Sequence, residues 1–180
     1  MLRSLHMKLV LIMILLVVCL MTIAGAFLTS SINQFYLNEF YSQMSGVFQD
    51  AELVRDLTVQ TEGEEDGGLA MEQVLKAYMG ALGVDGRNRN YFVLSGGDLR
   101  YLAGSDDEEG ADLEVTPNLL IALNEKREGS ESDPTAGYMD LAIPVHRGGQ
   151  DYIIYILDSQ NNLRQLNSEI FRLIIEALGF

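Results

Sequence analysis

Four consecutive acidic residues, Asp106, Asp107, Glu108 and Glu109, form the densest group of potential cation ligands in the chain. A calcium-binding EF-hand loop needs acidic residues at its first and twelfth positions and a glycine at its sixth. With Gly110 at the sixth position, Ser105 falls at the first and Thr116 at the twelfth, and neither carries a charge. We therefore expect a solvated acidic loop that binds divalent cations only loosely, and no dedicated metal site.

Two adjacent glycines, Gly96 and Gly97, separate two short apolar runs, and such a turn can either hold a phosphate or close a β-hairpin. A phosphate-binding turn opens a helix and carries a Lys-Ser/Thr pair or further glycines at fixed spacing. Here the runs 91–95 and 99–103 are both rich in strand-forming residues, and neither phosphate pattern is present. The sequence therefore predicts a hairpin closed by the two glycines.

Residues suited to catalysis are scarce. His6 and His146 are the only histidines, and Cys19, inside an apolar run, is the only cysteine, which excludes an intrachain disulfide and any multi-histidine metal site. No Ser or Cys motif marks a nucleophile for His146, so we expect no enzymatic activity and no cofactor on this chain. The alternatives for His146 are an ordinary surface position near a turn and a pH-responsive role.

The formal net charge of −14 argues against nucleic acid as a partner. A surface that binds nucleic acid needs clustered Lys and Arg to replace the counterions of the phosphates, and no block of basic residues occurs in the chain.

Residues 9–28 form a continuous apolar run without charge, and a helix of that length spans roughly 30 Å, the thickness of a bilayer core. Arg3 and Lys8 precede the run, and the first acid after it is Glu39. Because basic flanks stay in the cytoplasm, we expect an uncleaved membrane anchor with a cytoplasmic N-terminus and an extracytoplasmic domain in the plasma membrane. The alternative is a signal peptide cleaved after the small residues Ala24-Gly25-Ala26.

Periodicity and turn residues predict the remaining elements. Strand pairs joined through helices favour an α/β (α+β) fold, in which an antiparallel sheet of four or five strands packs on a long N-terminal helix. The expected elements are a helix over 31–59, an acidic loop over 61–68, a helix over 69–82, the hairpin 91–103, a helix from Thr116-Pro117 to 124, a polar loop over 125–137, strands 138–145 and 152–157 joined by a turn at 147–150, and a helix over 161–180.

The order of these stretches resembles the N-terminal sensory region of bacterial membrane sensor histidine kinases, with an extracytoplasmic PAS-like (Cache-type) domain. The resemblance covers essentially the whole chain and rests on order and spacing. The stretches that carry it are "RSLHMKLVLIMILLVV", "FYLNEFYSQM", "LGVDGRNRNYFVLSGGDLRYLAGSDDEEG", "LEVTPNLLIALN", "YMDLAIPV" and "DYIIYILDSQNNLRQL".

The resemblance implies a domain order: a cytoplasmic N-terminus at 1–8, a transmembrane helix at 9–28, a sensor domain at 29–170 and the start of a second membrane-directed helix at 171–180. It implies a signal-input function in two-component signal transduction, with the ATP-dependent kinase catalysis on a part that this chain does not carry. The alternatives are a secreted or anchored ligand-binding protein without signalling output, and the sensor half of a chemotaxis or cyclic-nucleotide receptor.

Strand alternation suggests where a small ligand or ion would bind. Met139, Leu141, Ile143 and Val145 share the face that packs on helices, which leaves Tyr138 and Asp140 on the other face. A PAS-like pocket lies between the sheet and the connecting helix, so the resemblance makes four residues candidates for its lining. These are Arg100, Tyr138, Asp140 and Tyr155, and the alternative is that they are ordinary half-exposed sheet positions.

The long helix also suggests a partner. Its apolar stripe either covers the core alone or, in its membrane-proximal half, also pairs with a second copy of the chain in a homodimer.

Overall fold

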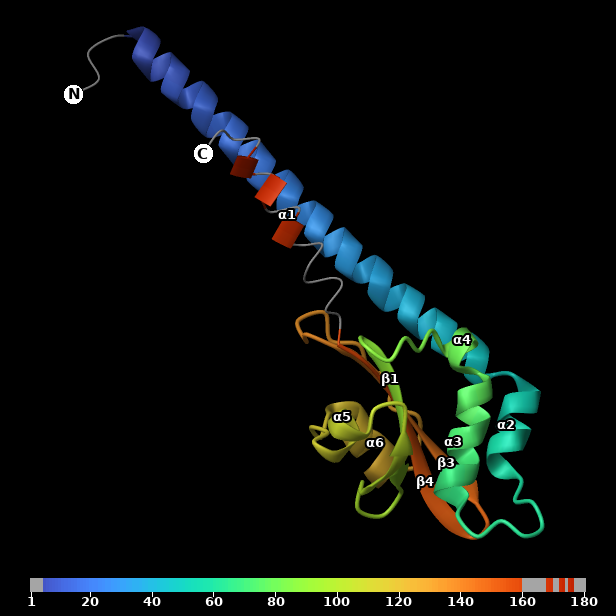
Figure 1. The fold of residues 1–180 in the computed structure, drawn as a ribbon. Helices are drawn as coiled ribbons and strands as arrows, with labels where there is room; N and C mark the ends of the chain where they lie inside the picture. Colours follow the sequence, from blue (N-terminus) through green and yellow to red (C-terminus); the bar gives the residue numbers. More distant parts are fainter. Residues whose placement is uncertain (1–4, 160–167, 170–171, 174, 177–180) are drawn as a thin grey trace. The chain divides into compact units, whose positions relative to one another are not determined.

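A computed structural model describes residues 5–159, 168–169, 172–173 and 175–176 (Figure 1). The chain divides into two compact units, Leu37–Gln160 and the combination of Met1–Tyr36 with Asn161–Phe180. Of the helix expected over 161–180, the six described residues are helical, and the rest of that prediction lies outside the described residues.

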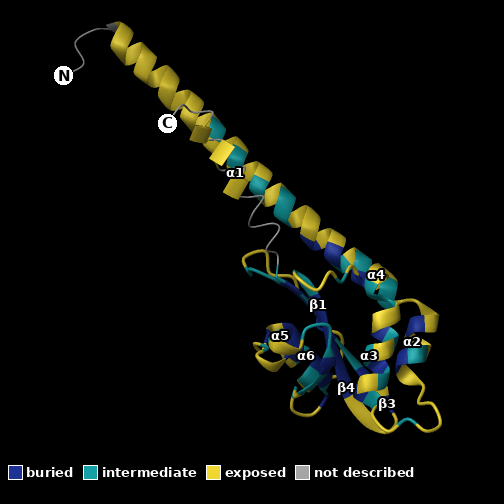
Figure 2. Cartoon of the chain, viewed as in Figure 1, coloured by how far each residue is buried: buried dark blue, intermediate teal, exposed yellow. Residues whose placement is uncertain are grey.

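Helix α1, Leu5–Phe48, is continuous for 44 residues and includes the whole apolar run 9–28. By length and composition it could cross a membrane, a property that it shares with signal sequences near an N-terminus. Figure 2 shows this first part of α1 as mostly exposed. Its last turns differ, because Leu37, Phe40 and Met44 are buried in the core of the unit Leu37–Gln160.

The prediction of one helix over 31–59 is wrong at its end. The helix stops at Phe48, and a separate helix α2 covers Ala51–Thr58. The break lies at Asp50, which is extended (φ −65°, ψ 117°) and whose carboxylate accepts hydrogen bonds from the backbone N–H groups of Glu52 and Leu53. An N-cap of this kind stabilises a new helix start, which ends the longer one.

The helix predicted over 69–82 begins earlier and divides in two. Helix α3, Gly67–Ala77, starts behind the N-cap Asp66, and the one-turn helix α4 covers Met79–Leu82. Gly83 ends α4 in the left-handed conformation (φ 66°), which is typical of a glycine that ends a helix.

Four antiparallel strands, β1 (Arg89–Ser95), β2 (Tyr101–Gly104), β3 (Met139–Arg147) and β4 (Gln150–Asp158), form one sheet in the order β2-β1-β4-β3. Both predicted hairpins are confirmed. Gly96 and Gly97 lie in the turn between β1 and β2, and the register shifts once, between Val93 and Leu94. In the second hairpin Gly148 (φ 57°) and Gly149 (φ 76°) form the two-residue turn, and positive φ at both positions suits the twist of the strands.

The two faces of the sheet carry different cores. Figure 1 shows α2 and α3 on one side of the sheet and α5 and α6 on the other. On the α1–α3 side, Met139, Leu141 and Val145 are buried, with Ile143 packed against them, which confirms the predicted alternation. On the other side Leu119 and Ala122 of α6 pack on strand residues such as Phe92 and Ile153.

The acidic run is a short helix and not a loop. Asp106 caps α5, Asp107–Ala111, through the backbone N–H groups of Glu108 and Glu109. Helix α6, Pro117–Glu125, begins as predicted, because the hydroxyl of Thr116 accepts from Leu119 N–H and Pro117 takes the first helical position.

The outer edge of β3 is partly occupied by the loop that precedes the strand. Gly129 and Ala142 exchange two backbone hydrogen bonds, of 2.8 and 2.9 Å. Pro144, two residues further on, has no N–H group to offer.

Candidate functional site

Asp140 is the centre of a buried polar cluster between the sheet and α6. It lies on β3, is 4% exposed, and accepts hydrogen bonds from three side chains. Thr116 Oγ1 and Tyr155 Oη lie 2.6 and 3.0 Å from Asp140 Oδ2, and Asn118 Nδ2 lies 2.7 Å from Oδ1. The N-cap of α6 and two strands are therefore joined through one carboxylate.

Two phenols next to this carboxylate are held in their protonated form. Burial, and then the charge of Asp140, raises the pKa of Tyr155 well above its usual range. Burial, and then the charge of Asp140, also raises the pKa of Tyr41 to about 12. The Tyr41 hydroxyl donates to the backbone oxygens of Asp140 and Glu131 at 3.2 Å each, so α1 reaches the edge of β3 through this side chain.

The structure brings together some of the four predicted lining residues. Asp140 and Tyr155 are hydrogen-bonded to each other, and half-buried Tyr138 is near enough for the charge of Asp140 to raise its pKa after the effect of burial. Arg100 does not join them, because its side chain is 72% exposed beside Asp98. The prediction that Arg100 lies in a strand is wrong, since Leu99 adopts a positive φ of 59° and β2 begins only at Tyr101.

No local sequence pattern indicates that Asn118 and Tyr41 belong to this cluster. Asn118 donates to Asp140 and to Glu131 O, while its oxygen accepts from Glu131 N–H. Thr116 was recognisable as a helix cap, but the second bond of its hydroxyl, to Asp140, depends on tertiary contact.

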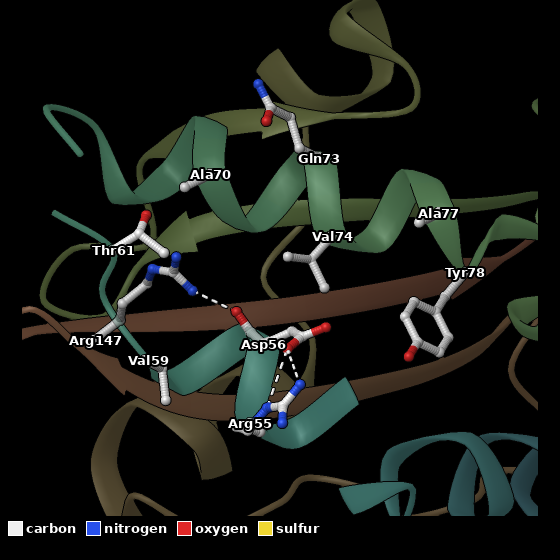
Figure 3. A pocket seen from close by; sticks show the side chains of 10 residues that line it. All are labelled: Arg55, Asp56, Val59, Thr61, Ala70, Gln73, Val74, Ala77, Tyr78 and Arg147. Carbon is white, nitrogen blue, oxygen red and sulfur yellow. Dashed lines mark hydrogen bonds and ion pairs between the residues drawn. The ribbon is translucent and has the colours of Figure 1, made fainter. Parts of the chain in front are cut away.

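A hollow of about 440 Å³ lies between α2 and α3, on the opposite side of the sheet from the Asp140 cluster. Its volume falls within the range of small-molecule pockets. Figure 3 shows Val74 of α3 and Tyr78, which follows the end of α3, pointing into the space above α2, where Asp56 contacts two arginines. The lining comprises Arg55, Asp56, Val59, Thr61, Ala70, Gln73, Val74, Ala77, Tyr78 and Arg147.

The charged groups of this hollow are already paired. Arg55 lies 3.3 Å from Asp56, and Arg147 forms a two-bonded ion pair with Glu64 at 2.7 Å for each bond. Arg147 also donates to the backbone oxygens of Asp56 and Leu57, at the C-terminal end of α2. The Arg147 contacts fix the loop that joins α2 to α3. Because the lining is partly apolar and its charges are balanced, the hollow suits a small, largely uncharged molecule.

The acidic run does not gather into a metal site in the part of the chain that the structure describes. No group of three or more His, Cys, Asp or Glu side chains there is arranged to hold a metal ion. Several of these acids have protein partners: Asp107 accepts from the Tyr101 hydroxyl, and Glu109 accepts from Asn90 Nδ2 at 2.7 Å.

Comparisons with protein-family models, curated proteins and solved structures found no match to this chain. The fold and the contacts within it are therefore the basis for assigning a function.

Proposed function

We propose that the chain is the signal-input region of a membrane-bound receptor of the sensor histidine kinase type, with a PAS-like (Cache-type) domain outside the cytoplasm. In this role α1 anchors the chain with its N-terminus in the cytoplasm, and a signal acting on the outer domain changes the position of the helix. Two copies pair along α1, so that relative movement of the two helices carries the signal.

The observation that carries this proposal is the continuity of α1. One helix contains the apolar run 9–28 and, without a break, the buried side chains of Leu37, Phe40 and Met44. A rigid helix that is part of the core of an outer domain moves when that core rearranges, which a flexible tether would not do.

The Asp140 cluster is the proposed point of signal entry. It contains Asp140 and Tyr155 in direct contact and Tyr138 close by, beneath α6 and next to Tyr41 of α1. The hydroxyl of Thr116 donates to Asp140 and accepts from Leu119 N–H at the start of α6. A ligand or ion that competes for the Asp140 carboxylate would therefore loosen the N-cap of α6. The hollow between α2 and α3 is a second place where a small molecule would fit.

The competing function is a secreted or anchored ligand-binding protein without signalling output. The mass of the mature N-terminus in membranes separates the two, with a variant carrying Ala24→Leu and Ala26→Leu as an uncleavable control. An uncleaved wild-type chain supports the receptor. Cleavage after Ala26 would remove most of the apolar run and overturn it.

The signalling function is tested by joining the C-terminus of the chain to the second membrane helix and the cytoplasmic half of a histidine kinase, and measuring autophosphorylation. Each residue inserted after Thr29 rotates the rest of α1 by about 100°, so one alanine rotates the outer domain, whereas seven nearly restore its orientation. We expect one insertion to change the basal activity and seven to restore it. Equal activity for both would contradict signalling through α1.

A further inference from the structure

The guanidinium of Arg89 joins three elements that are far apart in the sequence. Arg89 is the first residue of β1, and its side chain is 15% exposed. Its Nε donates to Asp158 Oδ2 at 2.9 Å, at the last residue of β4. Its Nη1 donates to Gln43 Oε1 of α1 at 2.7 Å and to the backbone oxygen of Leu82 in α4 at 3.0 Å.

Further contacts fix the helix side of this junction. The guanidinium carbon of Arg89 lies 5.0 Å from the centre of the ring of Phe40, a fully buried residue of α1. The amide of Gln43 donates in turn to Ala81 O at 2.7 Å. Arg89 thus contacts two residues of α1 that are one turn apart on the same face.

The local backbone is arranged to present this side chain. Gly83 has a left-handed conformation, and a Cβ atom there would lie 2.7 Å from Arg89 Nη1, so any side chain would displace the guanidinium. Asp85 accepts from the N–H groups of Arg87, Asn88 and Arg89, which fixes the turn into β1.

We propose that Arg89 couples the end of β4 to helix α1, so that a displacement at Asp158 changes the packing of Phe40 and Gln43. A planar guanidinium with several fixed donors can hold a carboxylate and an amide oxygen at once, which a single ammonium group cannot do with the same geometry. That this coupling carries a signal rests on the proposed receptor function. The coupling itself rests only on the contacts of Arg89.

The test is hydrogen exchange of the full chain in lipid nanodiscs, without any added ligand, read at the backbone amides of 40–48. Asp158→Asn removes the charge at the strand end and keeps its size. We expect it to speed exchange of these α1 amides about fivefold, through local opening of the helix packing. In an Arg89→Met background the same Asp158→Asn change should alter the exchange less than about twofold, because the connection is already broken.

Arg147→Met is the matched control, since it breaks another buried ion pair, between Arg147 and Glu64. The other contacts of Arg147 lie on α2. The substitution should speed exchange in 56–64 and leave 40–48 unchanged. If Arg89→Met does not fold, Arg89→Lys replaces it. A single ammonium group can still pair with Asp158, but it lacks the second donor group with which the guanidinium also binds Gln43.

Three results would overturn the coupling: no effect of Asp158→Asn on α1, the same effect in the Arg89→Met background, or an equal effect of Arg147→Met on 40–48. None of them bears on whether α1 is an uncleaved anchor. Conversely, cleavage after Ala26 would overturn the receptor function and leave the exchange result standing.

Discussion

The side chains of Glu64 and Arg147, 83 residues apart in sequence, form an ion pair in which they are 6% and 4% exposed. Both carboxylate oxygens of Glu64 accept from Arg147, which attaches the loop after α2 to the end of β3. Removal of one member of a buried pair leaves the other charge without compensation, which typically costs about 3 to 5 kcal/mol. We therefore expect Glu64→Gln to lower the free energy of unfolding by about 3 kcal/mol, measured by chemical denaturation. Glu65→Gln, the exposed neighbour, is the control and should have almost no effect.

The same pair predicts a pH dependence. The hydrogen bonds from Arg147 lower the pKa of Glu64 from its ordinary value of 4.5 to about 2. A carboxylate with a lowered folded-state pKa stabilises the fold above its unfolded-state pKa, and this contribution disappears as the pH falls through the folded-state value. The difference in stability between wild type and Glu64→Gln should be complete above pH 4.5 and shrink toward pH 2. A difference that stays constant across this range would show that the charge of Glu64 is not what stabilises the loop.

The Asp140 cluster predicts unequal costs for two substitutions. Asp140→Ala leaves the buried donors of Thr116, Asn118 and Tyr155 without their acceptor, and we expect a loss of about 3 kcal/mol or more. Thr116→Val removes one donor and the cap of α6, and should cost about 1 to 2 kcal/mol. Thermal melting beside Asp112→Ala, an exposed control, measures both. Equal losses for Asp140→Ala and Asp112→Ala would mean that the cluster contributes nothing.

Leu141 is 2% exposed in the core, so Leu141→Asp should unfold the unit Leu37–Gln160, because an unpaired buried charge costs several kcal/mol. A solvated acidic loop, as the sequence predicts for 106–109, would make Asp substitutions at Glu108 and Glu109 equally silent. The structure separates them: Glu108 is exposed, whereas a shorter side chain at 109 would withdraw the carboxylate from Asn90. In thermal melts followed by circular dichroism, Glu108→Asp should be as stable as wild type, and Glu109→Asp should have a free energy of unfolding about 1 kcal/mol lower.

The proposed homodimer predicts which positions of α1 form crosslinks. Phe40 and Met44 are buried within one chain, whereas Asn38, Ser42 and Ser45 are exposed on α1. With Cys19 replaced by Ala, single cysteines at the three exposed positions should form disulfides in membranes, and Met44→Cys should not. Absence of crosslinks at the three exposed positions would contradict the paired-helix mechanism.

The features that sequence analysis predicted correctly are set by neighbouring residues. Thr116-Pro117 and Gly148-Gly149 each contain the whole chemistry of a helix start or a turn, so their placement needed no tertiary information. The end of α1 was missed because the apolar spacing continues past residue 50, and the capping carboxylate of Asp50 outweighs that periodicity. The contact of Asn118 with Asp140 joins residues 22 apart, on elements whose relative position no local pattern records.

The outer edge of β3 limits how copies of this chain can associate. An exposed strand edge is a template on which the strand of another molecule can add, and such addition propagates into aggregates. Here the outward backbone groups are taken at alternate residues: the oxygen of Asp140 accepts from Tyr41 and Asn118, Ala142 pairs with Gly129, and Pro144 has no donor. An incoming strand therefore meets no continuous row of donors and acceptors. This edge of the sheet therefore resists polymerisation by strand addition, however concentrated the protein is.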